Sequence, residues 1–273
     1  MIICPVCKEK LIKEGKKYQC KNNHSFDMAK QGYTNLLLSN QKHSKMPGDD
    51  KEMVLSRRRF LEKDYYKAIS DAVNNIVLDR ITNSQVNILD IGCGEGYYTK
   101  NLKNALEKNN IKGNIIGIDI SKEAVLAAAK SNKDIEWIVA SATNIPVEDS
   151  SLDFVICMFA KIIPEEKLRT LKKDGYLVVV STGENHLIEL KEVVYDNVRT
   201  EFYSPIEDLK IFEHEKTINC KTKVLIGENE SIKDLFDMTP YRWRSPKLGI
   251  ERLFSLDSLE ITIDVNIDIF IKK

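Results

Sequence analysis

The spacing of hydrophobic residues changes along the chain and separates regions of different character. Between residues 86 and 181, short apolar runs alternate with segments of helical periodicity, which is typical of β-α-β units in a parallel sheet. Helices are expected to begin near Tyr97, Lys122 and Glu165, with Ser121 as a cap for the second of them. The expected strands are 86–91, 115–119, 135–140, 154–158 and 177–181.

Two later segments alternate apolar and polar residues, as a strand with one buried face does. They are residues 218–226 and 261–271, and we expect both to be antiparallel strands. Residues 195–217 and 227–257 are less regular and are interpreted as insertions. The pattern as a whole predicts an α/β fold with a mainly parallel sheet.

The N-terminal region has a different composition. Residues 1–38 are polar and cysteine-bearing, so they bury little apolar surface. A segment of this kind needs a stabilising cross-link in order to fold. Residues 39–50 are interpreted as a linker, in which Asp49 or Asp50 caps a helix over 51–60, and a second helix is expected over 65–79. We therefore expect three parts: a small module (1–38), a linker with connecting helices (39–80) and a main domain (81–273).

Three cysteines and a histidine of this module have the spacing C-x2-C-x12-C-x3-H, namely Cys4, Cys7, Cys20 and His24. Two residues between thiolates suit a metal-binding knuckle, and a second pair about a dozen residues later completes a tetrahedron. These ligands favour zinc, and the absence of a spare carboxylate indicates a structural, ribbon-like site. The alternative is that the four residues hold no metal.

The remaining cysteines lie in apolar segments and are interpreted as packing residues: Cys93, Cys157 and Cys220. This usage is not a disulfide framework and suits a reducing compartment. A cysteine at position 4 leaves no room for a signal peptide, and the longest apolar runs are too short to span a bilayer. We therefore expect a soluble, cytoplasmic protein.

The net charge is zero, but it is unevenly distributed. Residues 1–70 contain 15 Lys and Arg against 8 Asp and Glu, whereas the rest of the chain contains 26 against 33. A polyanionic partner would therefore meet the N-terminal quarter. The alternative is a lysine-rich surface that is simply solvated.

A glycine-rich turn follows the first strand of the main domain. Asp90 precedes Gly92, Gly94 and Gly96, and Asp119 ends the next strand. The glycines permit a tight strand-to-helix turn against which a ligand can lie. Asp90 is placed to pair with an ammonium group, and Asp119 to accept two ribose hydroxyls. The alternative is another nucleotide-binding fold, such as a dehydrogenase.

This G-x-G-x-G arrangement, over about residues 86–181, resembles the class I S-adenosylmethionine-dependent methyltransferases. The resemblance implies a Rossmann-like fold with a mainly parallel seven-stranded sheet. It also implies that the glycine loop, including Glu95 and Tyr97, cradles the methionine half of the donor. Asp119 and Ile120 would then lie at the ribose, and Thr143 and Asn144 would bracket the adenine.

The fourth-strand segment, residues 153–161, excludes two kinds of methyltransferase. It lacks the Asp/Asn-Pro-Pro-aromatic motif of enzymes that methylate exocyclic amino groups of bases. Its cysteine, Cys157, lacks the neighbouring proline that is common in cytosine-C5 enzymes and sits in an apolar strand. Neither an exocyclic amine nor a ring carbon is therefore the expected acceptor.

Several further motifs resemble one family in collinear order over essentially the whole chain, the 23S ribosomal RNA guanine-N1 methyltransferases. The resemblance implies a zinc module that helps to grip RNA, a substrate hairpin in 23S rRNA, and a homodimer. By matching position it places Tyr66 and His186 at the donor site. Which of the family's two branches applies, and thus which guanine, stays open. The motifs are residues 26–37, 47–53, 57–61, 186–191 and 238–243.

Removing the N1 proton of guanine requires a general base or a hydrogen-bond relay. His186 is a candidate, but its expected role at the donor competes, so no catalytic residue is assigned. Two other functions stay open: a small-molecule methyltransferase, and an RNA-binding protein with an inactive methyltransferase fold. One group combines basic and aromatic side chains and is suited to engage a base or the backbone of RNA: Arg242, Trp243, Arg244 and Lys247. The alternative is that Trp243 belongs to the core and that the basic side chains are simply solvated.

Overall fold

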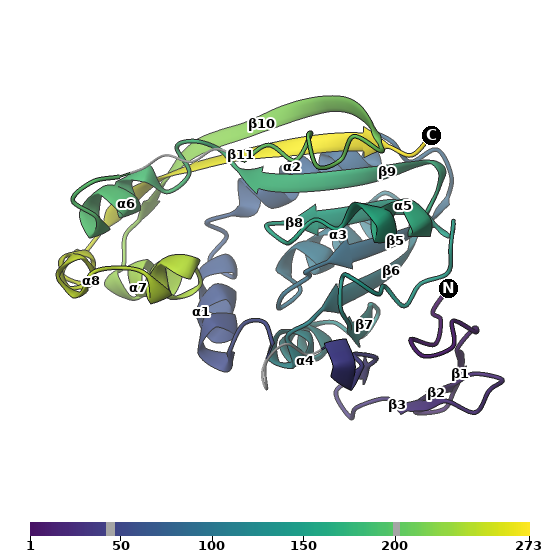
Figure 1. Ribbon diagram of the computed structural model, residues 1–273. Coiled ribbons are helices and arrows are strands. Elements are labelled where there is room, and N and C mark those ends of the chain that lie inside the picture. The colour runs from purple at the N-terminus through teal and green to yellow at the C-terminus, as the bar shows by residue number, and fades with distance from the viewer. Residues whose placement is uncertain (42–46, 199–202) are drawn as a thin grey trace.

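The computed structural model describes residues 1–41, 47–198 and 203–273. A large, mainly parallel sheet forms the centre, and a small three-stranded sheet lies near one of its edges (Figure 1). Part of the expected linker, residues 42–46, falls outside the described residues. The strands of the large sheet are ordered β10-β11-β9-β8-β5-β6-β7-β4.

The five expected parallel strands are present and adjacent, which confirms the β-α-β interpretation. Each pairs in parallel with its neighbour in the sheet. β9 begins well before the expected residue 177, because a register shift in its pairing with β8 extends it over polar residues that the hydrophobic pattern misses. The five are β5 (Gln85–Ile91), β6 (Lys112–Asp119), β7 (Glu136–Val139), β8 (Leu152–Met158) and β9 (Leu171–Thr182).

The two alternating segments form the antiparallel end of the sheet, as expected. They are β10 (Glu213–Ile226) and β11 (Leu259–Ile271). The last strand, β11, inserts between β9 and β10 and is antiparallel to both. Its side chains are almost all buried, whereas β10 forms the edge of the sheet and is mostly exposed.

Among the residues that the structure describes, the large sheet has eight strands, one more than the seven that the family resemblance implied. The extra strand, β4 (Tyr33–Asn35), comes from the N-terminal segment and pairs in parallel with β7. The backbone N–H of Leu36 continues this pairing by donating to Val139 O at 2.9 Å. A three-residue strand is too short to show periodicity in the sequence.

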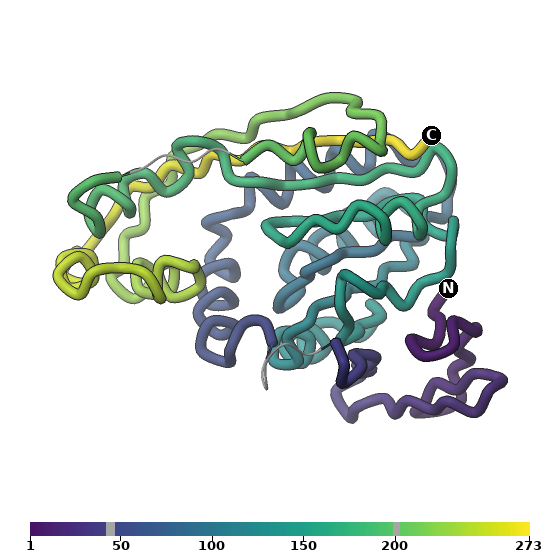
Figure 2. Tube along the Cα trace, in the orientation of Figure 1, coloured from purple at the N-terminus to yellow at the C-terminus, as the bar shows by residue number. Residues whose placement is uncertain are grey.

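The small sheet consists of β1 (Ile12–Glu14), β2 (Lys17–Gln19) and β3 (Ser25–Asp27), all antiparallel. It belongs to the N-terminal module, which lies beside the β7 edge of the large sheet (Figure 1). In the same orientation, the tube trace shows α1 near the middle of the molecule, between the large sheet and the helices at the far left (Figure 2). A short 3-10 helix, η1 (Ser39–Gln41), precedes the undescribed part of the linker.

Helices cover both faces of the large sheet. On one face pack α2 (Lys67–Leu78), α3 (Tyr97–Lys108) and α4 (Lys122–Ser131), around Trp137 and other buried apolar side chains. On the other face lie α5 (Pro164–Thr170) and parts of the N-terminal module, which share a second apolar core. Ser121 caps α4 as expected, because its Oγ accepts from the N–H of Ala124 at 3.2 Å.

A third group of helices stands beyond the carboxyl ends of the parallel strands (Figure 1). Asp50 caps the first of them, accepting from the N–H of Met53 at 2.9 Å. The region 227–257, interpreted as an irregular insertion, is largely helical and is interrupted at Pro240 and Pro246. The group comprises α1 (Lys51–Leu61), α6 (Ile188–Val194), α7 (Asn229–Asp237), η2 (Pro240–Trp243) and α8 (Lys247–Phe254).

Within the described ranges, none of the helices has the length and apolar character needed to cross a bilayer.

Candidate functional site

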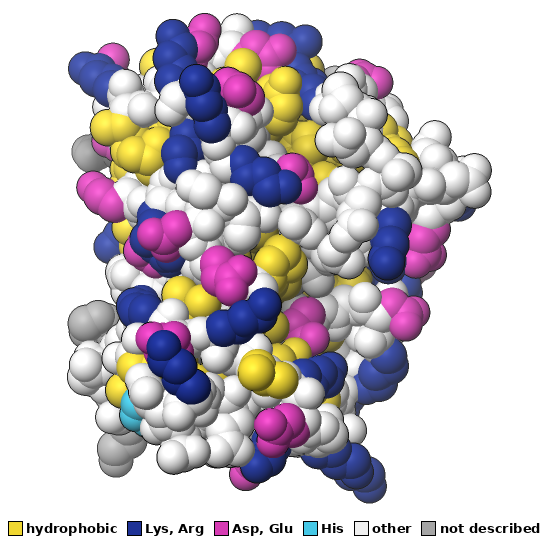
Figure 3. All heavy atoms as spheres, turned by 90° about the vertical axis from the view of Figure 1, so that its right-hand side faces the viewer, with side chains coloured by type: hydrophobic (Ala, Val, Ile, Leu, Met, Phe, Trp, Pro, Cys, Tyr) yellow, Lys and Arg dark blue, Asp and Glu magenta, His cyan; other side chains and the backbone are white. Residues whose placement is uncertain are grey.

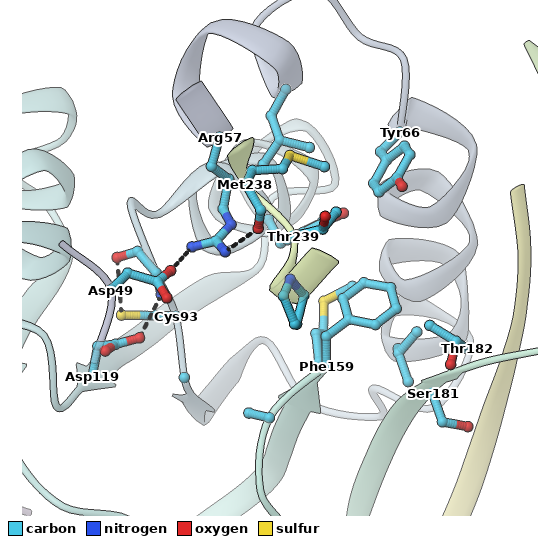
Figure 4. Close-up of a pocket in the computed structure, with 18 of the residues that line it drawn as sticks. Asp49, Arg57, Tyr66, Cys93, Asp119, Phe159, Ser181, Thr182, Met238 and Thr239 are labelled. Carbon is cyan, nitrogen blue, oxygen red and sulfur yellow. Dashed lines mark hydrogen bonds and ion pairs between the residues drawn. The ribbon is translucent and has the colours of Figure 1, made fainter. Parts of the chain in front are cut away.

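A cavity of about 650 Å³ opens where the parallel strands end, between the sheet and the third group of helices. Parallel α/β sheets bind ligands at this edge, because the connecting loops and helix N-termini converge there. Its walls come from the loop after β5, from residues 48–66, from the ends of β8 and β9, and from residues 238–241 (Figure 4). Segments that lie far apart in the sequence thus enclose one space.

The glycine turn forms one wall of the cavity. Gly92, Gly94 and Gly96 all have left-handed backbone angles, with φ of 74°, 56° and 89°, which other residues rarely adopt. A Cβ atom at Gly92 would lie 2.6 Å from the Cβ of Ala160, so this glycine allows the loop after β8 to come close. A Cβ at Gly94 would meet nothing within 4 Å, which leaves open space for a ligand.

Asp119 is held against the same turn. Its Oδ2 accepts from the N–H of Gly94 at 3.0 Å, and its Oδ1 accepts from the N–H of Ser121 at 2.8 Å. Burial raises the pKa of this carboxyl, while the two backbone donors oppose that rise. Each oxygen retains a lone pair for a ligand hydroxyl.

Two further carboxyls on this wall are buried. Thr99 donates to Asp90 Oδ2 at 2.6 Å, and burial raises the pKa of Asp90 to about 6. Glu95 accepts from the N–H of Tyr97 at 3.0 Å, and burial raises its pKa to about 7. Because burial penalises the ionised forms, a cation bound beside either carboxyl would stabilise its charge.

Tyr66 and His186, 120 positions apart in the sequence, meet at the cavity. The hydroxyl of Tyr66 lies 3.3 Å from His186 Nε2, and His186 Nδ1 accepts from the N–H of Asp264 at 3.3 Å. An accepting Nδ1 puts the proton of the neutral ring on Nε2, so His186 donates to Tyr66. Burial lowers the pKa of His186 to about 4, which keeps the ring neutral.

This arrangement bears on the role of His186 as a base. Both ring nitrogens already have a hydrogen-bond partner, so neither offers a free lone pair to a ligand proton. The hydrogen of the Tyr66 hydroxyl, in contrast, is free to be donated to an oxygen atom in the cavity. The geometry thus favours a ligand-positioning role for this pair.

Seven of the expected donor-site residues line the cavity: Tyr66, Asp90, Gly92, Gly94, Glu95, Asp119 and His186. The other five lie outside its walls. Gly96 packs beneath Trp137, and the hydroxyl of Tyr97 donates to Asp64 at 3.0 Å. Thr143 is exposed, Asn144 accepts from Lys8 of the N-terminal module, and Ile120 lies beside Gly48.

One group of cavity residues was not expected from the sequence. Asp49 forms an ion pair with Arg57, and Arg57 Nη2 donates to the carbonyl of Met238 at 2.9 Å (Figure 4). Ser121 fastens the same segment by donating to Asp49 O at 2.7 Å. Arg57 therefore joins the segment before α1 to the segment after α7 across the cavity. The motifs around residues 47–53 and 57–61 were the available signal, but they do not reveal this pairing.

The four expected zinc ligands converge in the N-terminal module. Their ligand atoms all lie within 4.8 Å of one another. Cys7 Sγ and Cys20 Sγ are 3.7 Å apart, and His24 Nδ1 lies 3.6 Å from Cys4 Sγ and 3.5 Å from Cys20 Sγ. A tetrahedron with metal–sulfur bonds of about 2.3 Å has S···S edges of about 3.8 Å, so the spacing fits zinc.

The module is not independent of the main domain. The N–H of Ile3 donates to Pro146 O at 3.0 Å, and the N–H of Glu148 donates to Met1 O at 2.8 Å. The terminal ammonium also pairs with Glu148 at 3.1 Å. Together with β4, these contacts attach the expected module 1–38 to the large sheet.

Cys157 is fully buried in β8, and burial raises its pKa, as for a packing residue. Cys93 is buried at the cavity wall with a raised pKa, and Cys220 is partly buried on β10. The basic-aromatic group lies at and after η2, where Trp243 is 65% exposed. The guanidinium of Arg242 stacks over its ring at 4.9 Å, so this tryptophan is not a core residue.

Two parts of the chain match models of known protein families. Residues 2–45 match a zinc-ribbon family model described as "RlmA, N-terminal", and residues 88–183 match one described as "Methyltransferase domain". The YcgJ protein of Bacillus subtilis, a solved structure, is similar with a TM-score of 0.48 and 18% identity, covering 73% of this chain and 97% of that one.

Curated relatives cover more of the chain. A Bacillus subtilis protein named "Putative 23S rRNA (guanine-N(1)-)-methyltransferase YxjB" is 31% identical over 100% of this chain and 97% of its own length. A Streptomyces fradiae protein named "23S rRNA (guanine(748)-N(1))-methyltransferase" is 29% identical over 70% of this chain and 66% of its own. The chain therefore belongs to the family of 23S rRNA (guanine-N1)-methyltransferases.

Proposed function

We propose that this protein transfers the methyl group of S-adenosylmethionine to N1 of one guanine in a hairpin of 23S rRNA. The observation that carries the proposal is the two-walled cavity. Its glycine-loop wall presents Asp90 and Asp119, and its opposite wall presents aromatic and hydroxyl side chains. Its volume of about 650 Å³ lies within the range of small-molecule sites.

In this proposal the glycine-loop wall binds the methyl donor. Asp119 accepts from the ribose hydroxyls, Asp90 pairs with the ammonium group, and Gly94 leaves room for the methionine half. Bound S-adenosylmethionine supplies a methyl group on an already cationic sulfur, so the protein mainly positions the two reactants. Tyr66 donates its free hydroxyl hydrogen to the donor's carboxylate.

The more distant expected contacts depend on how far the adenine reaches. Ile120, Thr143 and Asn144 follow β6 and β7, beyond Asp119. They border the adenine if the donor extends past the cavity wall in that direction. Gly96 and Tyr97 do not contact the donor in this proposal. They fix the conformation of the glycine loop and the start of α3.

The opposite wall receives the target base. The N1 atom of guanine lies on its Watson–Crick edge, so the base must be unpaired or flipped out to reach the donor. The polar side chains at this wall include the hydroxyls of Ser181, Thr182 and Thr239. Hydroxyl groups suit a relay that passes the N1 proton onward, and we assign no single general base.

The N-terminal module and η2 provide surfaces for RNA. Figure 3 shows the molecule from the right-hand side of Figure 1. On this face, Lys and Arg side chains are interspersed with Asp and Glu and do not form one uniform basic patch. RNA hairpins are recognised through their shape, phosphates and unstacked loop bases, for which scattered cations and exposed aromatic rings are suited. Trp243, stacked with Arg242, offers such a ring close to the cavity residues Pro240 and Tyr241.

We further propose that the protein works as a homodimer, as the family resemblance implies. The test is the molar mass in solution by light scattering. A mass of one chain over a wide concentration range, with and without RNA, would contradict this part of the proposal.

Primer extension on unmodified 23S rRNA tests the reaction. A methyl group on N1 removes a Watson–Crick donor, so reverse transcriptase stops one nucleotide before the modified guanine. We expect a stop within a hairpin loop that requires both enzyme and S-adenosylmethionine and is weaker in Asp119→Ala when the donor concentration is limiting. Methyl incorporation without a stop, or incorporation only into a small molecule, would overturn the proposal.

A further inference from the structure

Phe159, the residue directly after β8, combines two unusual features. Its φ is +52°, in the left-handed region that bulky residues rarely occupy. Its side chain is 43% exposed although it belongs to the cavity wall. A strained backbone persists only where the surroundings impose it, and such residues cluster at ligand sites.

The surroundings of Phe159 impose this conformation from several directions. Its own N–H donates to Val180 O at 2.9 Å, which ties it to β9. The next residue, Ala160, packs against Gly92 of the glycine turn, where even a Cβ would not fit. The ring is thus presented by a fixed loop.

The ring points into the cavity. In the close-up, Phe159 extends into the space bounded by Tyr66, Thr239 and Thr182 (Figure 4). Its plane is nearly parallel to the His186 ring, at 27° and 6.3 Å between centroids. An aromatic face in this position, next to the glycine turn, is available to a flat ligand that approaches the donor.

We propose that Phe159 is the platform on which the target guanine stacks during methyl transfer. The inference rests on the proposed function, because it names the residue that orients the base at that site. Stacking on an aromatic side chain is the usual way in which proteins hold an unpaired base. The contact between Ala160 and Gly92 sets the platform beside the donor wall, so a base stacked there would have its edge near the methyl group.

One other occupant fits an exposed aromatic ring beside a methyl donor, namely the sulfonium itself, through a cation–π contact. The two roles differ in what they affect. A base platform changes the KM for RNA and leaves donor affinity intact. A sulfonium contact weakens S-adenosylmethionine more than the uncharged product S-adenosylhomocysteine. The guanine is favoured here, because 43% exposure leaves the ring far more open than the buried carboxyls that line the donor wall.

The experiment compares Phe159→Ala, Phe159→Leu and Phe159→Tyr with the unchanged protein. Steady-state kinetics on unmodified 23S rRNA give kcat and KM, and calorimetry gives the Kd for S-adenosylmethionine and S-adenosylhomocysteine. Leu keeps most of the apolar volume without an aromatic face, and Tyr keeps the face. Leu225→Ala, which alters an exposed apolar side chain on β10, is the matched control.

We expect the KM for RNA to rise about tenfold to a hundredfold in the Ala and Leu variants, as loss of one base-stacking contact predicts. Tyr should restore it, and both donor-analogue Kd values should stay unchanged. A selective loss of S-adenosylmethionine affinity would overturn the proposal in favour of the sulfonium contact. An unchanged KM for RNA in Phe159→Leu would overturn it outright. Failure of the proposed function is distinguishable, because the unchanged protein would then produce no reverse-transcriptase stop.

Discussion

Asp90 and Asp119 end neighbouring strands, but their surroundings differ in the hydrogen-bond donors that they provide. Asp119 receives two backbone N–H groups, which stabilise its charge before any ligand arrives. Asp90 accepts one hydrogen bond, from the hydroxyl of Thr99, and is otherwise desolvated. The first is thus a preformed acceptor, whereas the second gains most from a cationic partner.

For Asp119→Ala we predict that S-adenosylmethionine binding weakens by about 1–3 kcal/mol, because the ribose hydroxyls lose a buried acceptor. Titration calorimetry measures the change. Asp257→Ala, which removes an exposed carboxylate outside the cavity, is the control and should bind as the unchanged protein does. Equal affinity of the two variants would refute the assignment of the ribose to Asp119.

Asp90 leads to a pH prediction. Its pKa is raised to about 6 in the ligand-free protein, so the protonated form is favoured on folding. Its contribution to the free energy of unfolding is full below the ordinary value near 3.8 and is lost as the pH rises through about 6. Donor binding should run the other way, because the ammonium group requires the ionised carboxylate.

We therefore expect S-adenosylmethionine affinity to rise by about tenfold between about pH 5 and about pH 7, as one group of pKa about 6 requires. Calorimetry across this range provides the test, with Asp90→Asn expected to flatten the profile. Glu95 also titrates near this range, with a pKa of about 7, so Glu95→Gln isolates its share. A profile that keeps its slope in Asp90→Asn would count against the ammonium pairing.

Two different interactions stabilise the elements of the N-terminal segment. The three-stranded sheet has few buried apolar side chains of its own and depends on the metal centre. β4 depends on β7 and belongs to the large sheet. Removal of the metal should therefore affect the two parts differently, although both lie within residues 1–38.

For Cys7→Ser we predict loss of zinc and of hydrogen-exchange protection in residues 1–27, because a closed tetrahedral site does not survive without one thiolate. Protection of residues 88–183 should persist, since those strands and helices have their own core. Metal analysis and exchange mass spectrometry are the measurements. Cys220→Ser serves as the control and should retain one zinc per chain. A full complement of zinc in Cys7→Ser would contradict the ligand set.

At the scale of the whole molecule, Arg57 links the parts that surround the cavity. It joins Asp49, from the segment that follows the N-terminal module, to the carbonyl of Met238, from the helical insertion near the C-terminus. A neighbouring pair, Arg59 and Asp234, fastens α1 to α7 with contacts near 3.0 Å. The third group of helices is thus held over the sheet by charged contacts as well as by apolar packing.

Arg57→Ala should lower the free energy of unfolding by about 1–3 kcal/mol, because Asp49 and the Met238 carbonyl both lose a charged partner. It should also speed donor dissociation, because the cavity wall loses its cross-link. Urea denaturation and stopped-flow release measure the two effects. Arg58→Ala, next in sequence, removes only an exposed pair with Glu62 and should cost no more than about 0.5 kcal/mol. Equal effects of the two variants would argue against a bridging role.

Features that depend on neighbours along the chain could be predicted from the amino-acid pattern alone. Short apolar runs predicted β5 to β9, and alternating apolar and polar residues predicted β10 and β11. Asp50 and Ser121 marked helix starts that the structure reproduces. The spacing of Cys4, Cys7, Cys20 and His24 was enough to identify the metal centre, because knuckle ligands lie close together in sequence. The glycine turn could be recognised for the same reason, because its residues lie within a segment of seven.

Which distant segments of the chain meet depends on tertiary packing. β4 became the eighth strand because the edge of β7 was available to it, and three residues carry no readable period. Arg57 reached Met238, and His186 acquired its tautomer from Asp264, through contacts between residues more than 70 positions apart. Phe159 belongs to the cavity wall, and the residue after it, Ala160, packs on Gly92, which is 68 positions earlier in the chain. Hydrophobic periodicity records which face of an element is buried, but not the partner that buries it, so these parts of the site emerge only on folding.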